Sequence, residues 1–171
     1  TIGIIGYGNN GSAFCDIIKG FGMQILTYDK YLTKYSYKTS MKKIFENSDI
    51  LSIHIPLTEE TSYLINNKFI NQFKKSFFLI NTSRGKCVNT NHLVKALKSG
   101  KIKGACLDVL EFESHSFETL KRNAKEANLE YLINSNNVIL SPHIAGWTHE
   151  SKIKIAKILL SKIILDFAES N

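Results

Sequence analysis

Three kinds of side chain that can act together on a carbonyl compound occur at separate places along the sequence. Arg84 lies in an Asn-Thr-Ser-Arg-Gly stretch, His143 lies in Ser-Pro-His-Ile-Ala-Gly, and the acids Asp108, Glu111 and Glu113 lie between them. An arginine binds a carboxylate in a bidentate fork, a histidine donates a proton to a forming alkoxide, and an acid orients that histidine. Beside a bound dinucleotide, such a set indicates hydride transfer to a keto acid.

A glycine-rich segment, Gly6-Tyr7-Gly8-Asn9-Asn10-Gly11, follows the first apolar run and opens the first helical segment. In a GxGxxG motif the first glycine allows the tight turn, the second lets the backbone approach a pyrophosphate, and the third allows close packing of helix on strand. Asp29 ends the second apolar run, 18 residues past Gly11, where a carboxylate accepts hydrogen bonds from the ribose of adenosine. A carboxylate there also repels a 2′-phosphate, so the sequence favours NAD over NADP.

The elements that position these residues follow an alternating pattern of apolar runs and helical segments. We expect strands at residues 2–5, 23–28, 50–54, 77–81, 102–109 and 137–140, and helices at 11–21, 41–47, 67–73, 89–99 and 148–168, with an insertion at about 115–134. The apolar runs are mostly continuous, which is typical of parallel strands covered by helices on both faces. The pattern predicts one domain over residues 1–171, a doubly wound α/β fold in three layers (αβα).

The carboxyl ends of parallel strands face the ligand crevice of such a sheet. We therefore expect the polar clusters that begin at His54, Asn81, Asp108 and Ser141 to converge on one site.

The composition excludes several other classes of function. The net charge is +7, but only two of the 22 basic residues are arginines and the lysines are scattered, so we expect no nucleic-acid partner. No apolar run is long enough to span a membrane and no secretory signal is present, which favours a soluble, cytoplasmic protein. The three cysteines are far apart and are expected to be reduced, and no spacing of histidines and cysteines resembles a metal site.

Taken together, the motifs resemble the NAD-binding domain of the D-isomer-specific 2-hydroxyacid dehydrogenases, a Rossmann domain. The resemblance rests on the glycine segment, Asp29, and the stretches at residues 50–58, 81–85, 104–109 and 141–146, in order and at family-like spacing. It implies the cofactor NAD and a small 2-hydroxy or 2-keto acid as substrate. It also implies a homodimer formed through this domain.

The resemblance assigns roles residue by residue. Arg84 would bind the substrate, Glu113 would be the acid paired with the histidine, and His143 would be the acid/base; Glu111 stays open as an alternative to Glu113. The cofactor would lie with its pyrophosphate on the backbone of Gly8, Asn9, Asn10 and Gly11, beyond the turn at Gly6. Its ribose would meet Asp29, its adenine would lie near His54 and Pro56, and its nicotinamide near Thr82, Asp108 and Gly146.

Some features depart from the family pattern. Asn10 replaces an aliphatic residue, and residues 114–135 form a longer insertion than is common. The chain begins inside the first strand, without the segment that forms most of the family's substrate domain, so we expect it to bind NAD(H) but to reduce keto acids poorly on its own.

Two other functions have the same kind of domain. A non-catalytic, NAD(H)-sensing protein of the corepressor type stays open, whereas formate dehydrogenase is disfavoured because that branch carries glutamine in place of Glu113.

The last helical segment is apolar on more than one side. Ile153, Leu160, Ile164 and Phe167 lie on one stripe at helical spacing, and Ile158 is apolar off that stripe. Such a helix needs a second surface to cover it, either a partner subunit, a further domain or its own core.

Overall fold

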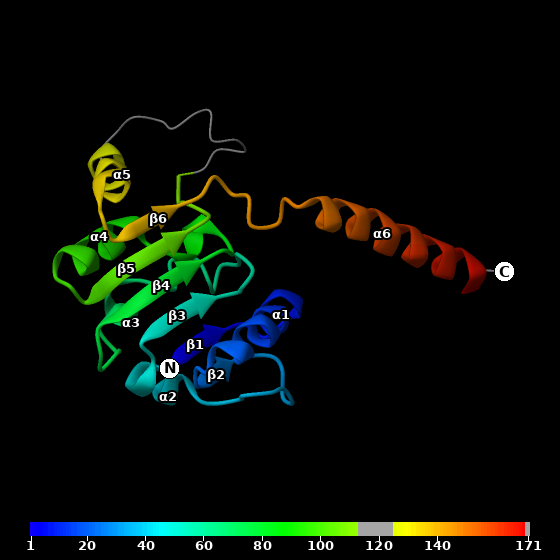
Figure 1. The fold of residues 1–171 in the computed structure, drawn as a ribbon, viewed down its shortest axis with the longest axis horizontal. Helices are drawn as coiled ribbons and strands as arrows, with labels where there is room; N and C mark the ends of the chain where they lie inside the picture. Colours follow the sequence, from blue (N-terminus) through cyan, green and yellow to red (C-terminus); the bar gives the residue numbers. More distant parts are fainter. Residues whose placement is uncertain (113–124, 170–171) are drawn as a thin grey trace.

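The computed structural model of the chain describes residues 1–112 and 125–169. A six-stranded, fully parallel sheet in the order β2-β1-β3-β4-β5-β6 forms its centre (Figure 1). The strands are β1 (Ile2–Ile5), β2 (Ile25–Tyr28), β3 (Ile50–Ile53), β4 (Phe77–Asn81), β5 (Ile102–Leu107) and β6 (Val138–Leu140). The helices are α1 (Asn9–Ile18), α2 (Met41–Asn47), α3 (Asn67–Ile70), α4 (Thr90–Lys98), α5 (Lys125–Asn134) and α6 (His149–Glu169), with short 3-10 helices at Lys19–Phe21 and Gly85–Cys87. The predicted doubly wound α/β fold is confirmed.

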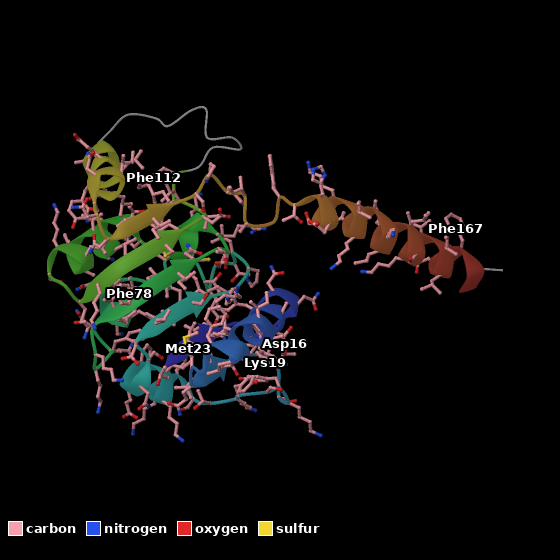
Figure 2. All side chains as sticks on the ribbon, in the orientation of Figure 1. Asp16, Lys19, Met23, Phe78, Phe112 and Phe167 are labelled. Carbon is pink, nitrogen blue, oxygen red and sulfur yellow. The ribbon has the colours of Figure 1, made fainter. Side chains whose placement is uncertain are left out.

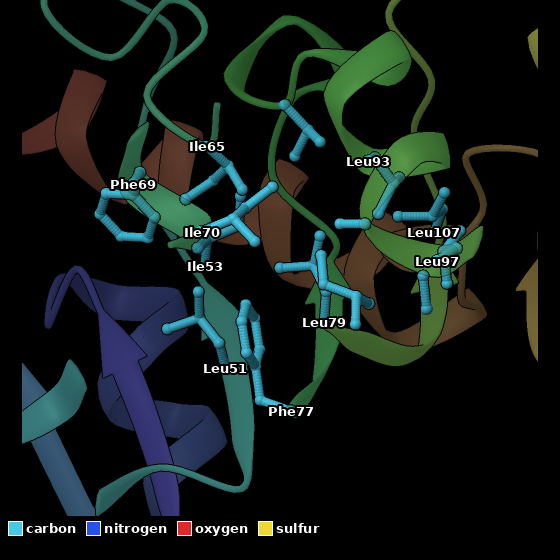
Figure 3. Packing of buried hydrophobic residues seen from close by; sticks show 14 of the residues in the cluster. Leu51, Ile53, Ile65, Phe69, Ile70, Phe77, Leu79, Leu93, Leu97 and Leu107 are labelled. Carbon is cyan, nitrogen blue, oxygen red and sulfur yellow. The ribbon is translucent and has the colours of Figure 1, made fainter. Parts of the chain in front are cut away.

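The sheet carries a separate apolar core on each face. On one face, Cys15 and Ile18 of α1 pack with Ile2 and Ile4 of β1. On the other face, helices α2 to α5 share one larger core with the strands, part of which is seen in Figure 3. Its members include Ile44, Leu51, Ile53, Ile65, Phe69, Ile70, Phe73, Phe77, Leu79, Leu93, Leu97, Ile102, Leu107 and Leu132. Right-handed crossovers explain this division, because α1 leads to one side of β1 and every later crossover leads to the other.

The strands are not all covered on both faces. All four residues of β1 are buried, as the apolar pattern predicts. For β4 and β6 the prediction that helices cover both faces is wrong. Phe78, labelled in Figure 2, is 46% exposed, and Ile139 is 67% exposed. Cys106 on β5, which pairs with Ile139, is exposed as well. These side chains lie on the face where α1 is the covering helix, and α1 packs on β1 at the other end of the sheet.

Helix α6 projects away from the sheet (Figure 1). Its apolar side chains are exposed, at 55% for Ile153, 58% for Leu160 and 58% for Ile164. The possibility that this helix lies within the chain's own core is therefore wrong. No helix in the described part of the chain is long and apolar enough to cross a membrane.

Candidate functional site

The glycine loop joins β1 to α1 in a conformation that only glycine supports. Gly6 has φ of +91°, and a Cβ there would lie 2.3 Å from the carbonyl oxygen of His54. A Cβ on Gly11 would lie 2.0 Å from the carbonyl oxygen of Gly6. In contrast, a Cβ on Gly8 would meet nothing within 4 Å. Gly6 and Gly11 thus serve the packing of the loop, while the backbone at Gly8 faces open space.

The amino end of α1 differs from those of the three helices that follow it. Ser40, Asn66 and Asn89 cap α2, α3 and α4 by accepting a bond from the N–H three residues later. Gly8, the N-cap residue before α1, makes no side-chain capping bond, and the first turn holds no acidic residue. The N–H groups of this turn, which includes Asn9 and Asn10, therefore remain for an anion, as at helix ends that bind phosphate groups.

Asp29 follows β2 and is held toward the glycine loop. Its Oδ2 accepts a bond of 2.8 Å from the N–H of Tyr7, and its Oδ1 accepts bonds from the N–H groups of Tyr31 (2.9 Å) and Leu32 (3.0 Å). Partial burial works against the charge, but these three donors outweigh it, so the pKa of Asp29 lies below its usual value. Because a carboxylate has about four acceptor sites, capacity for a further hydroxyl donor remains.

His54 follows β3 and its ring lies among protein atoms. Its Nε2 is 2.9 Å from Oγ of Ser52, and its ring centroid is 4.9 Å from that of Phe14 on α1. Burial lowers the pKa of His54 to about 4, so the ring is neutral near pH 7. Pro56, further along the same loop, is exposed, and its carbonyl accepts a bond from Thr61. Of the two residues predicted to lie near adenine, Pro56 is thus the one at the surface.

The loop after β4 is organised by the buried side chain of Asn81. Its Oδ1 accepts bonds from the N–H (3.0 Å) and hydroxyl (2.9 Å) of Ser83, and its Nδ2 donates to the carbonyl of Arg84 (3.1 Å). The guanidinium of Arg84 donates to the carbonyl of Ser83 at 2.6 Å. Thr82 and Arg84 themselves are exposed at the carboxyl edge of the sheet. A buried amide therefore fixes the backbone on which an exposed arginine stands.

The loops after β4 and β5 are in direct contact. A Cβ on Gly85 would lie 1.9 Å from the carbonyl oxygen of Leu110, so only a glycine lets the two backbones approach this closely. This contact brings the residue after Arg84 against the segment that leads from β5 toward Glu113.

Glu111 occupies the base of that segment. Its Oε1 accepts the hydroxyl of Tyr63 at 2.9 Å, and its Oε2 accepts the N–H of Thr90 at 3.0 Å. Both oxygens thus hold other loops in place, one after β3 and one at the start of α4. Glu113 lies outside the described residues.

Asp108 follows β5 and holds the turn after β6. Its Oδ1 accepts the hydroxyl of Ser141 (2.6 Å) and the N–H of Ile144 (2.9 Å), and its Oδ2 accepts the N–H of Ala145 (3.0 Å). Burial opposes the charge, but these donors and the nearby charge of His143 hold the pKa of Asp108 below its usual value.

His143 lies within that turn in a left-handed backbone conformation, with φ of +54°. Its N–H donates to the carbonyls of Asp108 (2.9 Å) and Ser141 (3.0 Å). A non-glycine residue in this region carries strain that surrounding bonds must balance. His143 and Gly146 are both exposed at the edge of the sheet.

A short series of hydrogen bonds connects the arginine loop to the histidine turn. Asn81 donates to Arg84, as described, and its own carbonyl accepts the N–H of Asp108 at 3.0 Å. Asp108 in turn accepts the N–H of His143. The structure therefore places Arg84 and His143, far apart in sequence, on the loops after β4 and β6. These two loops are connected through Asp108 after β5, at the same edge of the sheet as the glycine loop.

The sequence profile of the D-isomer specific 2-hydroxyacid dehydrogenase NAD binding domain matches residues 1–145. The chain belongs to this family. Glyoxylate reductase of Korarchaeum cryptofilum is 38% identical over 170 residues, which cover 96% of this chain and 48% of that protein. D-3-phosphoglycerate dehydrogenase of Dictyostelium discoideum is 39% identical over 174 residues, which cover 99% of this chain and 41% of that protein.

Solved structures agree with this membership of the dehydrogenase family. D-lactate dehydrogenase of Aquifex aeolicus, complexed with NAD and lactic acid, superposes with a TM-score of 0.83 at 34% identity, over 99% of this chain and 53% of that one. The D-isomer specific 2-hydroxyacid dehydrogenase of Lactobacillus delbrueckii, in an NAD-complexed form, superposes with a TM-score of 0.84 at 33% identity, over 98% of this chain. The chain thus spans about half the length of these relatives and corresponds to the NAD-binding domain of the family.

Three residues with positioning roles are absent from the predicted catalytic and cofactor-binding sets. Asn81 and Ser141 stand in the predicted polar clusters, and Glu111 appears there only as an alternative acid. Their bonds reach across strands and loops, so spacing along the sequence does not reveal them. For Asn81, the available signal is an amide that ends an apolar strand, because a polar group in such a place must find a partner.

Proposed function

We propose that this chain is the cofactor domain of an enzyme that transfers hydride between NAD(H) and a D-2-hydroxy acid or its 2-keto acid. The observation that carries the proposal is the hydrogen-bonded connection from Arg84 through Asn81 and Asp108 to His143, on the edge that also carries the glycine loop. In this proposal Arg84 is the anion-binding side chain, His143 is the acid/base side chain, and the glycine loop is the dinucleotide cradle at the same edge of the sheet.

The cradle fits NAD in its chemistry. The uncapped first turn of α1, from Gly8 to Gly11, would hold the pyrophosphate, and Asp29 would accept hydrogen bonds from the ribose. Pro56 and His54 would border the adenine side, His54 through its backbone against Gly6. Thr82, Asp108 and Gly146 would border the nicotinamide, with Asp108 acting through the turn that it holds. When bound, the reduced nicotinamide supplies the hydride.

The substrate steps fall to exposed side chains. Arg84 binds the substrate carboxylate in a bidentate fork and orients the keto group. His143, held by Asp108 and Ser141, donates a proton to the alkoxide oxygen during reduction and accepts it back during oxidation. No metal is part of this proposal.

Glu113 is proposed as the acid that orients His143. Glu111, the alternative, already has both carboxylate oxygens bonded, to Tyr63 and to Thr90. Its geometry supports a role in holding loops together, which leaves Glu113 as the better candidate.

The test measures NADH oxidation with glyoxylate, pyruvate and hydroxypyruvate, in the protein as the cell makes it. We expect turnover with at least one of them, and a loss of about 100-fold or more in kcat for His143→Gln with the NADH affinity unchanged. Arg84→Gln should mainly raise KM for the keto acid, because it removes the carboxylate fork. Tight NADH binding without turnover of any 2-keto acid would contradict the enzyme and favour an NAD(H) sensor.

We further propose that the protein forms a homodimer through this domain. The exposed apolar residues of α6, such as Leu160, and those of the open sheet face, such as Phe78, support this, because apolar area leaves water when two copies associate.

A further inference from the structure

One acidic side chain, Glu60, joins the loops that follow β2 and β3. The ammonium group of Lys30 donates a hydrogen bond to its Oε1, and the hydroxyl of Tyr31 donates to its Oε2 at 2.9 Å. Strands β2 and β3 flank β1 on either side. The bridge therefore crosses the edge of the sheet where β1 runs into the glycine loop, at the adenosine end of the cofactor cradle.

Glu60 is presented by a well-fixed turn. The N–H of Thr58 donates to the hydroxyl of Thr61 at 2.8 Å, and the N–H of Ser62 donates to the carbonyl of Thr58 at 2.9 Å. Thr61 also donates to the carbonyl of Pro56 at 2.6 Å. The backbone that carries Glu60 is consequently fixed by its own turn, and its carboxylate is held by its two donors.

Glu60 pairs with the ammonium group of Lys30, which lies next to the proposed ribose site. Lys30 directly follows Asp29 in the sequence. NADP differs from NAD by a phosphate on that ribose, and proteins that accept NADP place a cation nearby. Lys38, another lysine of this loop, instead donates to the carbonyl of Thr33 at 2.7 Å. Lys34, the third lysine of the loop, lies five residues beyond Asp29 and is exposed. Lys30 is the lysine of this loop that is adjacent to Asp29 in the sequence, and its partner is a carboxylate.

We propose that Glu60 is a cofactor-specificity residue, which engages and neutralises Lys30 and so disfavours NADP alongside Asp29. The inference rests on the proposed ribose contact of Asp29. It adds a second determinant from another loop, outside the glycine motif and the acid that follows it.

The experiment measures dissociation constants of NADH and NADPH by calorimetry for the 171-residue chain and its variants. Glu60→Gln removes the negative charge but keeps an acceptor for Tyr31. We expect it to tighten NADPH binding about fivefold, the factor that corresponds to the ~1 kcal/mol of an exposed ion pair, with NADH affinity unchanged. NADPH should still bind more weakly than NADH, because Asp29 remains.

Two controls make the result specific. In the double variant that adds Lys30→Gln to Glu60→Gln, the gain for NADPH should disappear, because the released cation is gone. Glu59→Gln, on the same turn, changes the net charge equally, but among the described residues no bond links Glu59 to Lys30. This variant should therefore leave the ratio of NADPH affinity to NADH affinity unchanged.

The outcomes separate the two proposals. An equal gain in Glu59→Gln, or a gain that survives the loss of Lys30, overturns the role of Glu60. NADH binding with an unchanged ratio in Glu60→Gln overturns it too, while the proposed function stands. A wild-type chain that binds no NADH removes both the ribose contact and the inference.

Discussion

The conformation of His143 depends on a neighbour that does not itself take part in proton transfer. Asp108 is buried, and its carboxylate accepts three bonds from the turn that carries the histidine. A residue at positive φ holds its position only while such bonds balance the strain. The acid therefore supports the site through the backbone around His143.

We expect Asp108→Asn to destabilise the protein by about 1–3 kcal/mol, because an amide nitrogen replaces one acceptor and faces an N–H donor. The measurement is urea unfolding. The control is Asp16→Asn, because the side chain of Asp16 is 73% exposed and its Oδ1 lies 3.6 Å from Nζ of Lys19. Because the pKa of Asp108 is depressed, its contribution is present above about pH 4 and is lost as the pH falls below that value. Equal stability of the two variants would contradict this role of Asp108.

His54 predicts a pH dependence of stability on the acid side of neutrality. Burial lowers its pKa from 6.5 to about 4, so between these values the unfolded chain binds a proton that the folded chain does not. The free energy of unfolding should keep its full value above pH 6.5. It should fall by up to about 1.4 kcal/mol per pH unit between pH 6.5 and pH 4, and it should level off below pH 4.

Unfolding free energies measured from pH 7 to pH 4 check this expectation. His54→Gln should flatten the decline, whereas His149→Gln, at an exposed position, should not. A decline of the same slope in His54→Gln would assign it to other groups.

At this scale the sequence predicts which residue types carry the chemistry but not what holds them. Arg84 and His143 stand on the loops after β4 and β6, at the edge of the sheet where residues that follow parallel strands are expected, and their roles stay predictions. The bonds of Asn81 and Glu111 could not be predicted, because each joins loops from different strands and depends on how closely those strands approach.

At the scale of elements, the contact between the loops after β4 and β5 depends on one glycine. We expect Gly85→Ala to destabilise the protein by about 1–3 kcal/mol, because its Cβ would lie 1.9 Å from a backbone carbonyl that must move. The same change at Gly20, where a Cβ meets nothing within 4 Å, should have little effect. Thermal or urea unfolding of both variants measures the difference, and a neutral Gly85→Ala would show that the loops separate freely.

The elements themselves are largely readable from the sequence. The predicted strand at residues 77–81 and helix at 41–47 match β4 and α2. In a chain that alternates strands and helices, apolar runs of this length with polar ends fit few other structures. Which strands are covered by helices could not be predicted from the sequence, because Phe78 is equally apolar whether a helix covers it or not. The right-handed crossovers place α2 to α5 together on the opposite face of the sheet.

At the scale of the whole molecule, the sequence does not determine which surface covers the apolar side chains of the last helix. The pattern allowed its own core, a partner subunit or a further domain, and the structure removes the first. A helix with this much exposed apolar surface buries it on association, which is favourable at roughly 25 cal/mol per Å².

We expect the 171-residue chain to sediment as a dimer and the double variant Leu160→Gln with Ile164→Gln to shift it toward monomer by more than about tenfold in dissociation constant. The two side chains lie one turn apart, each is 58% exposed, and removing them takes apolar area from one stripe. Glutamine is a good helix former, so far-UV circular dichroism should show unchanged helicity. Lys157→Gln, on the same helix, alters a polar position and should leave the dimer intact. A wild-type chain that stays monomeric at every concentration tested would contradict the homodimer. A dimer that the double variant leaves unaffected would assign the interface to another surface. The exposed face at Phe78 and Ile139 would then be tested next by substitution.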